Sequence, residues 1–202
     1  MTENKKLQFI KKPNKQKMVA LLLIFLWMFL WNVIYEALHM GGKLEFGSIH
    51  IINWPFFMSV IVFFLREHLS YKERFCHTLF GGAFGILFAA GVIFTYSKLA
   101  TAGIPKLAAI CIPLAIVLFI LIVLEPIFPI FFNNIGLAYF VVALVNNTTA
   151  VKNMPSYLVS LVLGSIILNL GCIAILKIYG KVLAKKAAKK AVPEKATEEV
   201  KS

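Results

Sequence analysis

Two apolar stretches of the chain, KMVALLLIFLWMFLWNVIYE (residues 17–36) and KLAAICIPLAIVLFILIVLE (residues 106–125), align without a gap. Each begins with a lysine and ends with a glutamate, so that Lys17 falls on Lys106 and Glu36 falls on Glu125. Each stretch is also long enough to cross the hydrocarbon core of a bilayer, which takes about 20 residues of α-helix. The alignment predicts that one membrane-spanning unit is written twice in this chain.

The similarity continues beyond these two stretches. NWPFFMSVIVFFL (53–65) matches NIGLAYFVVALV (134–145), which puts Asn53 on Asn134 and Pro55 on Gly136. Segments with many small residues follow in both halves, GGAFGILFAAG (81–91) and LGSIILNLGC (163–172). We therefore expect an all-α protein with two three-helix repeats. An odd number of helices per repeat forces the copies into opposite orientations, as in the inverted repeats of many secondary transporters.

Apolar runs bounded by polar or proline-containing segments predict six transmembrane helices. They cover residues 18–40, 51–65, 79–97, 107–125, 127–145 and 157–178. The predicted organisation is a basic N-terminal tail (1–17), a first repeat (18–97), a second repeat (98–179) and a lysine-rich C-terminal tail (180–202).

The composition agrees with a membrane protein. Hydrophobic residues make up 60% of the chain, charged residues make up 15%, and the mean hydropathy is +0.83. Soluble domains have about 45–50% apolar and about 25% charged residues. The excess of apolar residues is therefore interpreted as lipid-facing surface.

The net charge of +12 lies mostly in the two tails. Residues 1–17 hold six lysines and one glutamate, and residues 177–202 hold eight lysines and three glutamates, so each tail carries +5. Basic tails beside apolar helices are expected to bind the anionic lipid headgroups of a cytoplasmic membrane surface. A nucleic-acid partner is not expected, because the aromatic residues lie inside the apolar runs instead of among the basic ones.

The distribution of lysine and arginine predicts the orientation. With both ends in the cytoplasm, the inner side carries 17 basic residues, and the outer side keeps only Lys43, Lys98, Lys106 and Lys152. This asymmetry predicts a multi-pass protein of a bacterial cytoplasmic (inner) membrane with both termini inside.

Polar residues within apolar runs are candidates for a substrate path, because such residues are costly in a membrane. Glu36 and Glu125 are a repeat pair, and His39 lies three residues after Glu36, on the same helix face. Asn53 and Asn134 each begin a short segment that carries Pro or Gly. The complete set of path candidates is Glu36, His39, Asn53, Trp54, Glu125, Asn133 and Asn134. The alternative interpretation is that the glutamates end helices in the headgroup region and the amides join helices.

Small residues at helical spacing are candidates for close helix packing. This set comprises Gly81, Gly85, Ala89, Gly164 and Gly171. The three cysteines show no CxxC spacing, and the Glu36/His39 pair has no evident third ligand. No metal site, disulfide framework or cofactor is therefore expected.

The stretch NWPFFMSVIVFF (53–64), followed by LFGGAFGILFAAG (79–91), resembles a family of small bacterial inner-membrane proteins of unknown function with two internal repeats. The second copy is NNIGLAYFVVALV (133–145) with LVLGSIILNLG (161–171), and the resemblance covers residues 51–175. It implies an architecture and a bacterial origin but no activity. The chain departs from the family in having bulky Phe56 and Phe57 where small residues are typical, and in its long lysine tails.

These features favour a small-solute channel or secondary transporter. The alternative is a non-catalytic membrane subunit, the substrate-binding component of a larger bacterial importer. An enzyme is not expected, because the chain has no aspartate, four histidines and two widely separated glutamates within its spans. The sequence leaves open the substrate and the oligomeric state, a homo-oligomer included.

Overall fold

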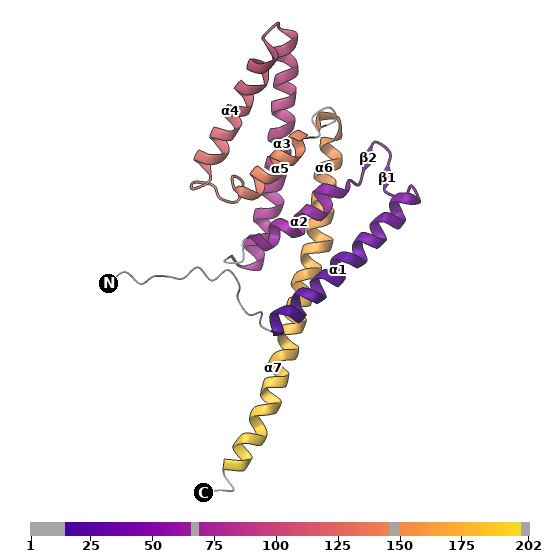
Figure 1. The fold of residues 1–202 in the computed structure, drawn as a ribbon, viewed down its shortest axis with the longest axis vertical. Coiled ribbons are helices and arrows are strands. Elements are labelled where there is room, and N and C mark those ends of the chain that lie inside the picture. The colour runs from indigo at the N-terminus through magenta and orange to yellow at the C-terminus, as the bar shows by residue number, and fades with distance from the viewer. Residues whose placement is uncertain (1–14, 66–68, 146–149, 199–202) are drawn as a thin grey trace, which may run out of the picture. The chain divides into compact units, whose positions relative to one another are not determined.

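The computed structural model describes residues 15–65, 69–145 and 150–198. These residues are helical except for a short β-hairpin and the connecting turns (Figure 1). The helices are α1 (Lys15–Met40), α2 (Asn53–Leu65), α3 (Tyr71–Thr101), α4 (Lys106–Leu124), α5 (Asn134–Val145), α6 (Ala150–Gly164) and α7 (Leu170–Glu198). A π-helical turn, η1 (Ser165–Asn169), joins α6 to α7, and the hairpin consists of β1 (Glu45–Phe46) and β2 (Ile49–His50).

Within the described ranges, four helical stretches are long and apolar enough to cross a membrane. They are Lys15–Met40, Tyr71–Thr101, Lys106–Leu124 and Val151–Lys186. The α2 and α5 helices have 13 and 12 residues. At 1.5 Å per residue, such helices reach roughly 20 Å, which is less than the roughly 30 Å of a hydrocarbon core. The all-helical, membrane-compatible architecture is confirmed, and the expectation that the chain crosses the membrane six times stays a prediction.

Three predicted helix starts differ from the observed ones by more than three residues, and one of them is the sixth helix, which was expected at residue 157 but begins at Ala150. The third helix was expected at residue 79, but α3 begins at Tyr71 because Ser70 and Glu73 form a capping box, with Ser70 Oγ accepting from the Glu73 amide at 3.3 Å. The fifth helix was expected at residue 127, but residues 125–131 form turns around Pro126 and Pro129, and α5 begins only at Asn134. Proline lacks the amide hydrogen that a helix interior needs, so the helix starts after both prolines.

The chain divides into two compact units, residues 33–171 and a smaller unit from the described parts of residues 1–32 and 172–202. In the smaller unit, the rings of Trp27 and Trp31 pack edge to face with their centroids 5.8 Å apart. Most side chains of α1 are exposed, and most of the exposed ones are apolar, which suits a helix surrounded by lipid.

In the unit of residues 33–171, α3 is the central helix and packs against α4, α5 and α6. One core cluster joins Ile86 of α3 to Tyr139 of α5 and Leu161 of α6. A second joins Val92 of α3 to Leu121 of α4 and Phe140 of α5. The α3 and α6 helices run in opposite directions (Figure 1).

The two short helices pack crosswise between the halves of the chain. The α5 helix lies along α3, and α2 lies along α6 and η1. A Cβ atom on Gly85 would collide with the carbonyl oxygen of Gly136, and a Cβ atom on Gly164 would collide with that of Phe56. Only glycine allows backbones to approach this closely, so these residues fix the contact between the long and the short helices.

Candidate functional site

A pocket of about 430 Å³ opens where the end of α1, the β-hairpin and the start of α2 meet. We call it the hairpin pocket. Its lining comprises Tyr35, Glu36, His39, Leu44, Glu45, His50, Ile51, Ile52 and Asn53. The fold therefore brings three of the predicted path residues, Glu36, His39 and Asn53, to one cavity, and adds Glu45 and His50.

Aromatic stacking and a hydrogen bond hold the wall of the hairpin pocket. The Tyr35 hydroxyl donates to the carbonyl oxygen of Ile51 at 2.8 Å, and its ring stacks on His39 with the centroids 6.0 Å apart. Across the hairpin, His50 Nδ1 lies 3.8 Å from Glu45 Oε1. The described residues include no cluster of three His, Cys, Asp or Glu side chains able to hold a metal ion. The carboxylates and imidazoles that line the hairpin pocket can attract a polar molecule and replace part of its hydration shell.

Two serines of α6 tie this wall to the bundle. The His50 amide donates to Ser156 Oγ at 3.0 Å, and the Ile52 amide donates to Ser160 Oγ at 2.7 Å. The Ser160 hydroxyl in turn donates to the Ser156 carbonyl oxygen at 2.6 Å. These side chains satisfy the backbone amides of His50 in β2 and of Ile52 just before α2, so the pocket wall is anchored on α6.

A row of buried polar residues continues along α6 and η1. We call this row the polar seam, and it consists of Ser156, Ser160, Ser165 and Asn169. All four side chains are buried, with exposed fractions of 2%, 0%, 0% and 0%. The steps of four keep Ser156 with Ser160 and Ser165 with Asn169, whereas the step of five between the two pairs turns the helix by roughly 140°.

The inner end of the polar seam has unused hydrogen-bonding capacity. The Ser165 hydroxyl and both polar atoms of the Asn169 amide are buried without a partner. The seam bends there through η1, and π-helical turns are frequent at functional sites. Buried polar groups without partners are rare in folded proteins, which makes this end a candidate binding position for water or a small polar molecule.

The α3 helix supplies the opposite side of this position. The nearest neighbours of a Cβ atom on Gly82 would be the Leu161 methyl groups, at 3.0 and 3.1 Å. Because α3 and α6 are antiparallel and α3 also contacts η1, the register places Thr78, four residues before Gly82, near Ser165, four residues after Leu161. Thr78 is fully buried, and its hydroxyl also has no partner.

Trp54, one of the predicted path residues, is half-buried and packs against both core clusters. Its ring centroid is 5.0 Å from that of Tyr157 and 5.8 Å from that of Tyr139. The Tyr139 hydroxyl donates to the carbonyl oxygen of Pro55 at 3.2 Å. This aromatic group packs the start of α2 against α5 and α6.

The remaining path candidates lie around the start of α5 and the end of α4. Asn133 is buried and caps α5: its Oδ1 accepts from the Gly136 amide at 2.9 Å, and its Nδ2 donates to the Pro129 carbonyl oxygen at 2.9 Å. Asn134 is the exposed first residue of α5, as Asn53 is of α2. Glu125 lies directly after α4 and does not line the hairpin pocket.

The predicted packing residues lie on α3, α6 and α7. Gly81 and Gly85 face α5, and Gly164 faces α2. Ala89 is fully buried in the cluster with Val117 and Phe140. Gly171 is half-buried at the second position of α7.

Comparisons with known proteins give no relative. No protein-family model matches the chain, and neither a curated protein nor a solved structure matches it.

Proposed function

We propose that this chain is a multi-pass membrane protein that conducts a small, uncharged polar solute, as a channel or as a secondary transporter. The single observation that carries this proposal is the polar seam. It starts at the hairpin pocket, runs along α6 and ends at the unpartnered Ser165 and Asn169 side chains.

The energetics favour a functional reason for these groups. A buried donor or acceptor without a partner costs about 1–3 kcal/mol, whereas an apolar side chain at the same position costs nothing of this kind. Hydroxyl and amide groups both donate and accept, so they can bind a neutral solute or a file of water molecules. The carboxylates and imidazoles of the hairpin pocket then act as its entrance.

The crosswise packing supports two inverted three-helix repeats. The long helix of each half carries a glycine that contacts the short helix of the other half, Gly85 on Gly136 and Gly164 on Phe56. The short helices begin at the matching residues Asn53 and Asn134. Short segments at corresponding positions of two halves often build the binding site of a transporter.

We also propose a bacterial cytoplasmic membrane as its location, with both termini inside. The support is the ratio of 17 basic residues on the inner side to four on the outer side.

Transport is tested with purified protein in liposomes. Stopped-flow light scattering after osmotic shock would follow glycerol, urea and erythritol, beside monovalent salts and empty liposomes. The informative variants are Ser165→Ala and Asn169→Leu. Their matched controls are Ser97→Ala and Asn32→Leu, which change the same residue types at exposed positions.

We expect flux of a neutral solute through the wild type and both controls, and a loss of flux in both seam variants. Equal flux in all five proteins would overturn the role of the seam. Absence of flux from folded protein would reject an autonomous channel or transporter. The alternative, a substrate-binding subunit of a larger importer, would then be tested by co-purification with an ATPase.

A further inference from the structure

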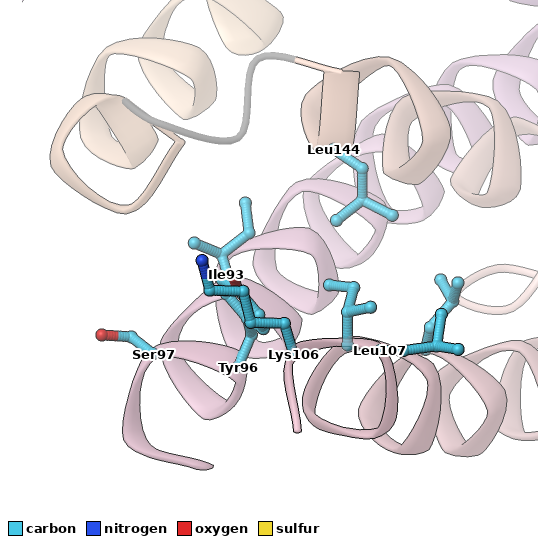
Figure 2. Close-up of a pocket in the computed structure, with 8 residues that line it drawn as sticks. Ile93, Tyr96, Ser97, Lys106, Leu107 and Leu144 are labelled. Atoms are coloured by element: carbon cyan, nitrogen blue, oxygen red, sulfur yellow. The ribbon is translucent and has the colours of Figure 1, made fainter. Parts of the chain in front are cut away.

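A second and larger pocket, of about 770 Å³, lies where the end of α3, the start of α4 and the end of α5 meet (Figure 2). We call it the α4 pocket. Its walls are mainly apolar and include Ile93 of α3, Ile110 and Leu114 of α4, and Leu144 of α5. Ligand sites typically enclose about 300–1,000 Å³, so the α4 pocket is large enough for one chain of an amphiphile.

The charge at the α4 pocket is positive. Lys106, the first residue of α4, is the only charged residue among the described residues that line it. In Figure 2 the Lys106 side chain extends across the opening toward Ile93, whereas the Ser97 hydroxyl points away from the group. A cation at one end of an apolar cavity is complementary to a molecule with an anionic head and an apolar tail.

The apolar walls favour a lipid over a soluble anion as the ligand of this pocket. A free anion would leave most of the cavity surface without a partner, whereas an acyl chain fills it. Selection among lipids must come from Lys106, because hydrocarbon tails contact the walls equally well whatever headgroup they carry.

We propose that the α4 pocket binds one anionic phospholipid, with an acyl chain between α3, α4 and α5 and its phosphate group at the Lys106 ammonium group. This site is separate from the polar seam and from the lysine-rich tails. It requires a membrane location but not transport, so its test is independent of the flux experiment.

The test uses delipidated full-length protein in detergent micelles, with equimolar phosphatidylglycerol and phosphatidylcholine of identical acyl chains. Native mass spectrometry would measure the ratio of the two lipids retained. The key variant is Lys106→Gln. Lys98→Gln is the matched control, because it removes the same charge from the same turn region, while its Nζ lies over the Phe94 ring, 5.6 Å from the centroid. Ile110→Trp fills the cavity.

We expect the wild type and Lys98→Gln to prefer phosphatidylglycerol about fivefold, as one lysine contact with an anionic headgroup implies, and Lys106→Gln to show no preference. Ile110→Trp is expected to retain less of both lipids while eluting normally in gel filtration. Equal retention of both lipids by the wild type would overturn the proposal. The proposal would also be overturned if the Lys98 and Lys106 variants lost the preference for phosphatidylglycerol equally, because the preference would then come from the general surface charge.

Discussion

The backbones of Gly81 in α3 and Gly136 in α5 lie so close that a Cβ atom on Gly136 would be 2.9 Å from the Gly81 carbonyl oxygen. Real Cβ atoms do not approach a backbone atom at this distance, and a carbonyl oxygen within a helix has little freedom to move. The two helices therefore depend on glycine at this crossing, where the first half of the chain meets the second.

We predict that Gly136→Ala destabilises the protein, because the methyl group forces α3 and α5 apart. Overpacking of this kind costs about 1–3 kcal/mol. The matched control is Gly91→Ala on α3, where a Cβ atom has no neighbour within 4 Å. Alanine is the better helix former, so this control is expected to gain stability. Melting temperatures in detergent micelles should thus move in opposite directions, and a shift of equal sign would contradict the close approach.

A second prediction concerns Asn133, which caps α5 and fastens it to the preceding turns. Asn133→Leu removes the acceptor for the Gly136 amide and the donor to the Pro129 and Ile130 carbonyl oxygens. Loss of an N-cap alone costs about 0.5–2 kcal/mol. We expect a lower melting temperature and faster hydrogen exchange over the first turn of α5, measured by mass spectrometry.

The same substitution at Asn169 should act in the opposite direction. Asn169 is fully buried like Asn133, but both of its polar side-chain atoms lack partners. Asn169→Leu removes a penalty of about 1–3 kcal/mol, so we expect a higher melting temperature together with lost solute flux. A variant that is both more stable and inactive would separate function from folding. A lower melting temperature would instead mean that the native protein keeps this amide hydrogen-bonded, to water for example.

Sequence reasoning predicted the helical class because apolar runs long enough to span a bilayer are a local signal. It placed the fourth helix within one residue at each end, at 107–125 against Lys106–Leu124. It missed the start of α3, although the S-x-x-E motif at Ser70 and Glu73 is a readable cap signal. It overextended the fifth helix, predicted from residue 127, across Pro129, where hydropathy stays high but the backbone turns.

The candidate site was only partly predictable, because its halves come from distant segments. Glu36, His39 and Asn53 were expected as path residues, whereas Glu45 and His50 reach the hairpin pocket only through two turns with positive φ, one at Gly42 and one at Gly47. The polar seam did leave a trace in the sequence, serines and an asparagine at intervals of four and five residues. Its burial depends on the packing of α2 and α3, which a single sequence does not specify.

A fourth prediction tests the anchor between the hairpin pocket and α6. Ser160→Ala removes the acceptor of the Ile52 amide, which lies 2.7 Å from Ser160 Oγ. The amide is then left without a partner, and we expect its exchange with solvent to accelerate about tenfold or more, since one such bond contributes about 1.5 kcal/mol. Ser97→Ala, at an exposed position, should leave this exchange unchanged. Unaltered protection in both variants would show that Ser160 does not hold the pocket wall.

The last prediction decides how many times the chain crosses the membrane. The α2 and α5 helices are short, and only four helical stretches within the described ranges are long enough to cross by themselves. If α2 and α5 nevertheless cross, α3 starts on the side of the chain termini, and Thr101 lies on the same side as the β-hairpin. If they do not cross, α3 and α6 must cross the membrane in the same direction, against their antiparallel packing in the structure (Figure 1), and Lys72 shares the side of the hairpin instead.

Three single-cysteine variants distinguish these topologies, each in a background with Cys76, Cys111 and Cys172 replaced by serine. They are Ser48→Cys in the hairpin, Lys72→Cys and Thr101→Cys, all at exposed positions. With an impermeant maleimide on intact cells, six crossings predict labelling of positions 48 and 101 and protection of position 72 until the membrane is permeabilised. Labelling of positions 48 and 72 with protection of 101 would mean four crossings. Two inverted three-helix repeats are then excluded, because an inverted pair requires three crossings in each half.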